Sequence, residues 1–403
     1  MIKARYWSFI PRRGSGRTQP PFAIRADLVG PAAERARGGG WLSAGELTAL
    51  FAETRPDAVE HIREAADELR AEVAGDAVTF VVNRNHQRFE RVHRGATRSV
   101  GSGKAGALLT RKSTTSRNSS DVLRRRLPMA PASCAFSPGS TLTGCSMTIS
   151  VGCAYRSAWR RTCIYTPTRP WRSRKCRTFS GLSLAELFAR LKNAGLGSTP
   201  GTAAEVLHGG VRERISPNKL PVARWVEIVE ASHAAGLRST STVMFGHVEE
   251  PWELAELMRV IRALQERTGG ITEFVPLSFI PFHTLLGRTH GSEEISREES
   301  LKRTAVFRLA LGRSIANVQA SWVKLGLDTA TESLRWGVND LGGTLMEESI
   351  SRLAGSYHGT KLDPDQLVAA AHDAGRPAAE RTTLYDARHH HPVPSDALLA
   401  RPT

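Results

Sequence analysis

Two features are scarce in this sequence: long apolar runs and closely spaced cysteines. No stretch approaches the roughly 18 consecutive apolar residues that suggest a transmembrane helix. The opening stretch, MIKARYWSFIPRRGSGRTQPPF, has no apolar core of the length that a secretory signal needs. We therefore expect a cytoplasmic protein with no membrane partner.

The few cysteines are also far apart. Cys134, Cys145, Cys153, Cys163 and Cys176 are separated by 11, 8, 10 and 13 positions. Zinc sites and iron–sulfur clusters usually take thiolates from pairs only a few residues apart. The spacing therefore predicts no metal site.

Acidic residues are nearly absent from one quarter of the chain. Residues 86–178 hold 19 Lys and Arg but only Glu90 and Asp121 as acids, a net charge of +17. The rest of the chain holds 36 basic and 37 acidic residues, so this segment accounts for the whole net charge of +16. The segment shows neither a helical nor a strand period, and it is too poor in apolar surface to offset its chain entropy easily.

Ordered structure is expected on either side of that segment. Residues 1–40 are rich in Gly, Pro and Arg, which predicts a disordered lead-in. Residues 41–85 predict two helices, the first opened by the capping-box residues Ser43 and Glu46, and then a β-branched strand. Regular structure resumes over residues 179–385. Residues 386–403, which contain RHHHPVP, predict a disordered tail.

Strand-like and helix-like runs alternate in the second ordered part. Strands are expected at 195–199, 238–244, 272–277 and 317–323, with helices between them and a further helix at 344–353. This alternation indicates βαβ units, hence an α/β fold with a parallel sheet or barrel, and periodicity does not decide between the two. At 403 residues the chain has room for one barrel with extensions.

Several polar residues follow expected strands, where a barrel carries its functional groups. Glu273 is the most informative, because an unpaired carboxylate among apolar neighbours on a buried strand would be costly. Glu205 could instead sit in the first turn of a helix, where a carboxylate is favoured. His247 could be a structural histidine, and Asn339 with Asp340 could be turn residues. None of them identifies a reaction alone.

Six blocks of sequence carry a resemblance to a known family. They are VVNRN, GLSLAELFARLKNAGLGSTPGTAAE, NKLPVARWVEIVEASHAAGLRSTSTVMFGH, GGITEFVPLSFIPFH, NVQASWVKLG and VNDLGGTLMEESISRLAGSYHG. In order and spacing they resemble the tyrosine-using radical S-adenosylmethionine (SAM) enzymes of F0 synthase, which make the deazaflavin core of coenzyme F420. The resemblance covers roughly residues 41–85 and 179–385. Menaquinone-pathway enzymes that act on futalosine derivatives are the alternative, although SWVKLG and NDLGGTLMEE look more like the deazaflavin branch.

The resemblance implies a radical SAM TIM-type (βα) barrel with a [4Fe–4S] cluster and SAM as cofactors. It also implies transfer of the 4-hydroxybenzyl fragment of L-tyrosine to 5-amino-6-(D-ribitylamino)uracil, with a separate F0 synthase subunit 1 as partner. Thr202 and Glu205 would approach SAM. The candidates for substrate contact are His247, Glu273, Gln319, Asn339 and Asp340.

The chain departs from the family at the cluster. After VVNRN the family continues into a CxxxCxxC loop, whose three thiolates bind three irons. Here Asn85 is followed by HQRFERVHRG, with no cysteine before Cys134. The simplest hypothesis is a reading-frame shift that ends near Phe179. It would leave the barrel incomplete, because residues 86–178 lack barrel strands, and the chain inactive as written.

Two other interpretations of residues 86–178 stay open. A basic arm could bind RNA or DNA through phosphate contacts. Against this, the segment has few interleaved aromatic residues for base stacking and would replace strands that the barrel needs, so nucleic acid is not the expected partner. A pseudoenzyme with a structural role has no direct support in the sequence.

Overall fold

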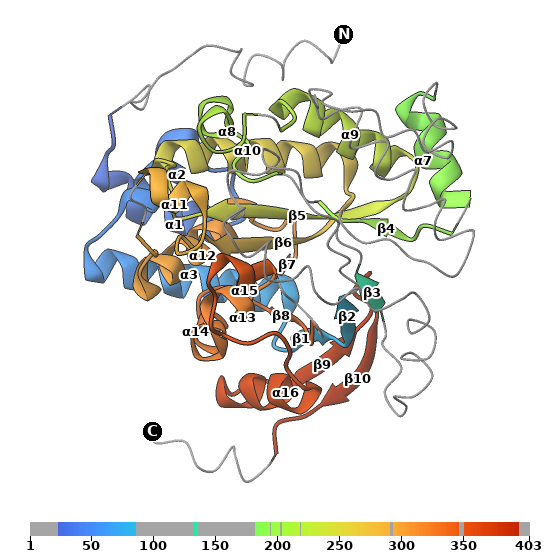
Figure 1. The fold of residues 1–403 in the computed structure, drawn as a ribbon. Coiled ribbons are helices and arrows are strands. Elements are labelled where there is room, and N and C mark those ends of the chain that lie inside the picture. The colour runs from blue at the N-terminus through green and yellow to red at the C-terminus, as the bar shows by residue number, and fades with distance from the viewer. Residues whose placement is uncertain are drawn as a thin grey trace.

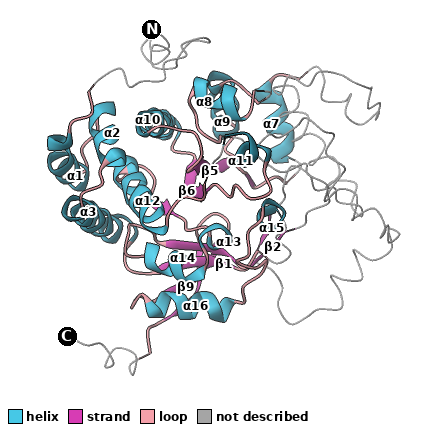
Figure 2. Ribbon diagram, turned by 60° about the vertical axis from the view of Figure 1, so that its left-hand side comes forward, coloured by secondary structure: helices cyan, strands magenta, loops and turns pink. Residues whose placement is uncertain are grey.

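The computed structural model describes residues 23–85, 133–135, 182–193, 195–201, 204–217, 219–290, 293–345 and 350–394. These residues form an α/β fold in which helices lie outside central parallel strands (Figures 1 and 2). Within these ranges, no helix is both long enough and apolar enough to cross a bilayer. Apart from 133–135, the basic segment 86–178 lies outside the described residues.

The N-terminal part consists of helices that lead to the first strand. They are η2 (Ala26–Leu28), α1 (Val29–Arg37), α2 (Ala44–Ala52) and α3 (Pro56–Ala74). The predicted capping box opens α2: Ser43 Oγ accepts a hydrogen bond from the Glu46 N–H over 3.2 Å, and the Glu46 carboxylate accepts one from the Ser43 N–H over 2.8 Å. The disordered lead-in predicted for 1–40 is wrong for residues 26–37. Its buried alanines, Ala32, Ala33 and Ala36, join the main core.

Six strands form one curved parallel array. They are β1 (Val78–Val81), β4 (Ser198–Thr199), β5 (Arg238–Phe245), β6 (Ile271–Ser278), β7 (Asn317–Val318) and β8 (Asp340–Gly343). The order is β4-β5-β6-β7 in one sheet and β8 beside β1 in the other, and a bridge between Gln319 and Asp340 joins the two. Beyond β1, β2 (Asn83–Asn85) pairs with β3 (Ser133–Ala135). Among the described residues no pairing connects this edge to β4, so the expected α/β barrel is confirmed but not closed.

Helices cover the outer face of the strands. They are α7 (Leu184–Asn193), α8 (Gly209–Ile215), α9 (Val222–Ala234), α10 (Pro251–Thr268), α11 (Leu285–His290), α12 (Arg297–Leu311), α13 (Trp322–Leu325), α14 (Leu327–Ser333), α15 (Ile350–Ala354) and α16 (Pro364–Asp373). Phe307 of α12 packs against Phe245 of β5 and Phe274 of β6, with ring centroids 5.5 and 5.4 Å apart. Because side chains alternate along a strand, the neighbours of these phenylalanines face the barrel interior.

Two strands are shorter than predicted, and the one expected at 195–199 is β4, Ser198–Thr199. The strand expected at 317–323 ends at Val318, and α13 begins at Trp322. The Trp322 indole N–H donates to the Gly343 carbonyl over 2.9 Å, which ties this turn to β8. Of the helix expected at 344–353, the described part is α15, and residues 346–349 lie outside the description.

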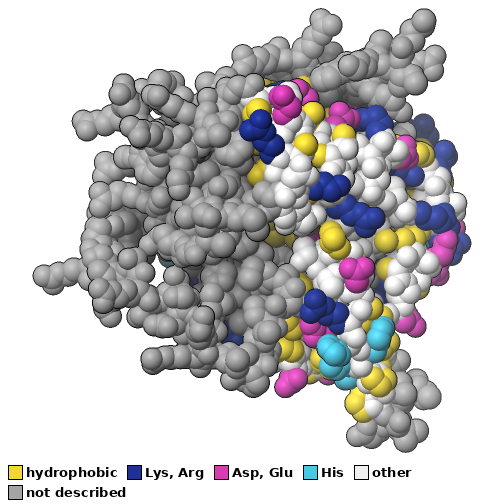
Figure 3. Space-filling model, turned by 90° about the vertical axis from the view of Figure 1, so that its right-hand side faces the viewer, with side chains coloured by type: hydrophobic (Ala, Val, Ile, Leu, Met, Phe, Trp, Pro, Cys, Tyr) yellow, Lys and Arg dark blue, Asp and Glu magenta, His cyan; other side chains and the backbone are white. Residues whose placement is uncertain are grey.

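The C-terminal part adds two strands to the barrel edge. β9 (Ala378–Arg381) runs parallel to β1, and β10 (Ala387–His391) runs antiparallel to β9. The disordered tail predicted from residue 386 is therefore wrong for residues 387–391. Backbone pairing with β9 orders this polar run, while the side chains of His389 and His390 stay exposed. Histidine side chains lie close together on the described part of the face in Figure 3.

Candidate functional site

A buried ionic cluster lies inside the barrel, near the starts of β6 and β8. Arg381, at the end of β9, places Nη2 3.1 Å from Glu273 Oε2 and Nε 2.5 Å from Asp340 Oδ2. The Tyr385 hydroxyl donates to the same Glu273 oxygen, and its ring stacks 3.9 Å from the Arg381 guanidinium carbon. Thr79 of β1 donates to Asp340 Oδ2 over 2.5 Å. Four strands thus meet at one cluster.

Burial dominates the electrostatics of this cluster. It raises the pKa of Glu273 above its ordinary value; nearby Asp340 adds to this effect, while Arg381 acts against it. The pKa of Tyr385 is raised well above its ordinary value, first by burial and then by the two carboxylates, so the phenol stays neutral. Burial disfavours the charged form of Arg381, but Asp340 and the other cluster residues together outweigh it and raise the pKa of Arg381. The cluster thus holds two carboxylates and one guanidinium.

Glu273 and Gln319 keep polar atoms available toward the interior. Both hydrogen bonds to the Glu273 carboxylate reach Oε2, and the side chain retains 11% exposure. Gln319, which directly follows the neighbouring strand β7, is half-buried, and its backbone N–H donates to the Phe274 carbonyl over 3.0 Å. Within the described ranges no hydrogen bond is found to Glu273 Oε1 or to the Gln319 amide. Among the described residues, these two predicted side chains therefore keep polar atoms without a hydrogen-bond partner.

A glycine makes room for the Gln319 amide. A Cβ at Gly342 would stand 2.6 Å from Gln319 Nε2, and Gly342 has a φ of +72°, which also favours glycine. The Gly342 N–H donates to Asp340 Oδ1 over 2.7 Å, so the same turn orients the cluster carboxylate.

Asn339, another predicted substrate residue, has partners on both amide atoms. Its Oδ1 accepts from Arg308 Nη2 over 2.8 Å and from the Val318 N–H over 2.9 Å, while Nδ2 donates to Asn317 Oδ1 over 3.0 Å. Arg308 is fully buried, and that burial lowers its pKa to about 9. The side chain of Asn339, just before β8, therefore links this strand to β7 and α12.

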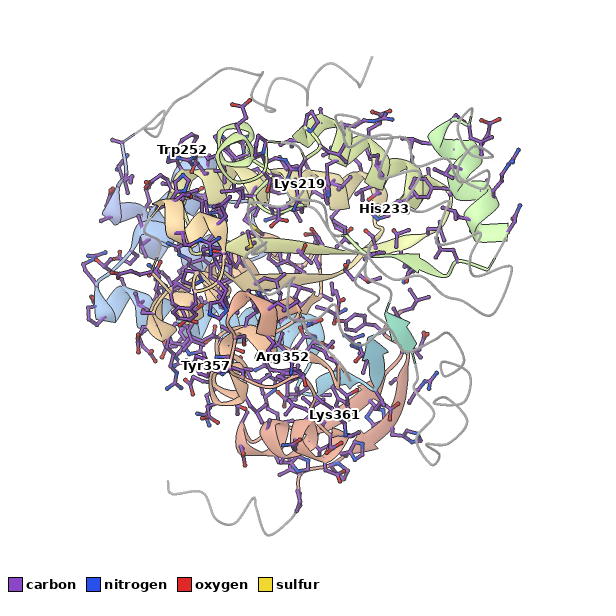
Figure 4. All side chains as sticks on the ribbon, in the orientation of Figure 1. Lys219, His233, Trp252, Arg352, Tyr357 and Lys361 are labelled. Atoms are coloured by element: carbon purple, nitrogen blue, oxygen red, sulfur yellow. The ribbon has the colours of Figure 1, made fainter. Side chains whose placement is uncertain are left out.

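Glu205 lies beside β5 and forms an ion pair with Lys219, which Figure 4 labels on the side of β5 where α8 and α9 lie. Its φ of +47° is rare for a residue with a side chain. Burial opposes ionisation of Glu205, but Lys219, Arg212 and His247 together lower its pKa. Thr202, the other predicted SAM residue, lies outside the described residues.

His247 occupies the turn after β5 and is fully buried. Its Nε2 lies 2.9 Å from the Met244 carbonyl, and its Nδ1 lies 2.9 Å from Glu249 Oε2. Glu249 also accepts from the Gly246 and His247 N–H groups and pairs with Arg303 over 2.7 Å. Burial opposes ionisation of Glu249, but His247 and Arg303 lower its pKa to about 2. The structure does not bring His247 to the interior cluster.

Arg381 and Tyr385 were missed by sequence reasoning, which placed them near the end of the ordered part. One signal pointed to a cation: the carboxylate of Glu273, expected on a buried strand, requires a partner. No sequence pattern distinguishes Arg381 from the many other arginines. Lys219 and Glu249 were missed for the same reason, since ion pairs form across loops whose path is not periodic.

The residues present do not fit a [4Fe–4S] cluster. Cys134, in β3, is the one cysteine within the described ranges, and its register partner is Arg84. Nor do those ranges hold a group of His, Cys, Asp or Glu side chains suited to a metal ion. The spacing of all five cysteines in the sequence excludes the three close thiolates that such a cluster takes.

Comparison with known proteins agrees with this architecture. The family model described as "CofH/MqnC C-terminal region" matches residues 268–393. The 5-amino-6-(D-ribitylamino)uracil–L-tyrosine 4-hydroxyphenyl transferase 1 of Methanosarcina mazei is 40% identical over 332 residues, which are 80% of this chain and 86% of that protein. The transferase of Gloeobacter violaceus is 38% identical over 381 residues, 87% of this chain and 92% of that protein. The chain belongs to this transferase family.

The same resemblance extends to fused enzymes and to the fold. FO synthase of Mycobacterium tuberculosis is 37% identical over 377 residues, 91% of this chain but 42% of that protein. HydG, a maturase of the [FeFe]-hydrogenase, matches with a TM-score of 0.61 at 13% identity over 90% of this chain and 78% of its own. Methylornithine synthase (PylB) matches with a TM-score of 0.51 at 14% identity over 86% and 96%. The radical SAM barrel fold and the deazaflavin branch are both confirmed, and the alternatives are not favoured.

Proposed function

We propose that this barrel is built for the transfer of the 4-hydroxybenzyl fragment of L-tyrosine to 5-amino-6-(D-ribitylamino)uracil. The observation that carries the proposal is the extent of the family match, which covers 87% of this chain and 92% of the Gloeobacter relative. The interior supports it, because Glu273 and Gln319 offer polar atoms there. In this family a [4Fe–4S] cluster and SAM supply the radical chemistry, and the chain as written lacks the cluster ligands.

The candidate residues divide by their surroundings. Glu273 and Gln319 are proposed to contact substrate directly, with Asp340 orienting Arg381 beneath them. Glu205 and Thr202 are proposed to approach SAM. His247 and Asn339 are proposed to hold strand ends in place, because their partners already satisfy them.

We infer that residues 86–178 are the product of a shifted reading frame. The described array runs through β1 to Asn85 and begins again at β4, and the sheet is not closed between these two edges. The sequence between these edges is poor in acids and shows no helical or strand period, whereas blocks that resemble the family flank it on both sides. A frame shift would replace both the cluster loop and the strands needed for closure.

Resequencing the gene across codons 80–185 tests the frame. We expect that a one-base correction restores CxxxCxxC after Asn85. The hypothesis is overturned if the other reading frames over this stretch lack that motif or contain many stop codons.

The activity is tested on the corrected chain and on the chain as written. After iron and sulfide reconstitution, we expect the corrected chain alone to cleave SAM and to form the tyrosine–pyrimidine adduct. SAM cleavage without an adduct, in the presence of both substrates, overturns the proposed function. We also propose a separate F0 synthase subunit 1 as partner, since the relative from Methanosarcina mazei, which this chain covers to 86%, is named for the transferase step alone. F0 formation only upon adding that subunit is the expected result.

A further inference from the structure

The interior cluster contains more negative than positive charge. Asp340 receives hydrogen bonds from Arg381 Nε and Nη2, and Glu273 receives one from Nη2. The remaining Arg381 nitrogen, Nη1, donates to the Thr382 carbonyl over 3.1 Å. Tyr385 is a neutral donor. One guanidinium therefore serves two carboxylates, and with Glu273 ionised the cluster has one negative charge in excess.

The second oxygen of Glu273 is available to a compensating charge. Arg381 and Tyr385 both donate to Oε2, which leaves Oε1 without a hydrogen-bond partner among the described residues. Gln319 directly follows the adjacent strand β7, and its amide lies against Gly342, where a Cβ would stand 2.6 Å from Nε2. A carboxylate oxygen and an amide oxygen are both acceptors for the N–H groups of an ammonium.

We propose that Glu273 and Gln319 form a recognition site for the ammonium group of an amino-acid substrate. Arg381 and Tyr385, from the C-terminal segment, are its positioning residues. The inference rests on the proposed function, in which L-tyrosine is the substrate, and adds the residues that bind its amino end. A cation suits this site better than a neutral arylamine, because only a cation neutralises the cluster.

Calorimetric titration of the full chain tests the site, with four probes. These are L-tyrosine, tyramine, 3-(4-hydroxyphenyl)propionate, which lacks the amine, and 5-amino-6-(D-ribitylamino)uracil, whose amine is neutral. We expect both ammonium probes to bind at least about tenfold tighter than the propionate, the effect of one charged hydrogen bond. Glu273→Gln should abolish this preference, and Gln319→Leu should reduce it. Glu380→Gln, on the other face of β9, is the matched control and should retain it.

Each other outcome counts against the site. Equal binding of tyrosine and the propionate overturns it, as does an unchanged preference in Glu273→Gln. So does a lack of tyrosine binding by a chain that shows a cooperative thermal unfolding transition. The proposal is also overturned if the parent shows no ammonium preference but binds the pyrimidine, and Glu273→Gln abolishes that binding. These residues would then contact the other substrate. If Glu273→Gln does not fold, Gln319→Leu decides.

The inference and the proposed function fail in different ways. Adduct formation by the corrected chain, with no preference for ammonium probes, overturns the site alone. A preference that depends on Glu273, with SAM cleavage but no adduct, overturns the proposed reaction and leaves the site standing.

Discussion

Arg381 donates two hydrogen bonds to the carboxylate of Asp340, from Nε over 2.5 Å and from Nη2 over 2.9 Å. Arg381 ends β9 and Asp340 begins β8, and β1 lies between these strands in the sheet. The ion pair therefore reaches across β1 and attaches the C-terminal segment to the barrel. Both side chains are nearly inaccessible to solvent, so water does not replace either partner.

Replacing Arg381 should strongly destabilise the protein. Arg381→Met leaves Asp340 and Glu273 buried without a cation, which typically costs about 3–5 kcal/mol. Urea unfolding at neutral pH measures the loss. Arg388→Met, on exposed β10, serves as the control and should stay within about 0.5 kcal/mol of the parent. A loss below about 1 kcal/mol for Arg381→Met would show that the cluster does not hold the C-terminal segment.

The sequence predicts the elements that have a strong hydrophobic period and misses one that lacks it. Long helices and strands such as 238–244 and 272–277 have strong periods, and the structure contains them as β5 and β6. The strand β10 has no apolar period, because it is ordered by backbone pairing with β9 rather than by burying side chains. Composition alone therefore predicted a tail where a strand exists.

Asn339 should matter for stability and not for ligand preference. Asn339→Ala removes the acceptor of Arg308 Nη2 and of the Val318 N–H, both of which are buried. Leaving such donors unsatisfied costs about 1–3 kcal/mol each. We expect a clear loss in urea unfolding, together with an unchanged ratio of tyrosine to propionate affinity. A changed affinity ratio with unchanged stability would mean that Asn339 contacts the substrate.

The structure brings some of the predicted site residues together and shows partners that the sequence did not indicate. Glu273 was predicted as a carboxylate on a buried strand, and the structure places it inside the barrel with Gln319 and Asp340. Asn339 is adjacent to Asp340 in sequence, but the alternation of side chains along a strand turns it away. No local pattern marks Arg381 or Tyr385, since their roles depend on where the chain returns after α16.

His233 should make the protein acid-labile. Its ring nitrogens lie 2.8 Å from Thr268 Oγ1 and from Ser239 Oγ, and Figure 4 labels it beside β5. Burial lowers its pKa to about 4, so the folded state favours the neutral ring. The stabilisation is complete above the unfolded value of about 6.5 and is lost as the pH falls toward 4, by up to about 3 kcal/mol.

Urea unfolding at pH 7.5 and pH 4.5 measures this loss. His233→Gln has no proton to gain, so it should show a much smaller decrease over the same interval. Glu249 and Glu53, whose pKa values lie at about 2, lose their stabilising charge only at lower pH. Equal pH dependence in the parent and in His233→Gln would assign the acid lability to other groups.

Ammonium binding should itself depend on pH through Glu273. Burial raises the pKa of this carboxyl, with a further contribution from Asp340. Only the ionised form neutralises an ammonium, so affinity should be retained above the raised pKa and fall as the pH drops through it. Titrations of tyramine between pH 5 and pH 8 measure this, because its ammonium stays charged throughout.

The propionate probe separates this effect from acid unfolding. Its affinity should not decline in parallel with that of tyramine, because it makes no charged contact with Glu273. In Glu273→Gln the tyramine affinity should be low and independent of pH over the same range. A parallel decline in affinity for both probes would mean that the protein unfolds. A decline in tyramine affinity that persists in Glu273→Gln would mean that a group other than Glu273 causes the pH dependence.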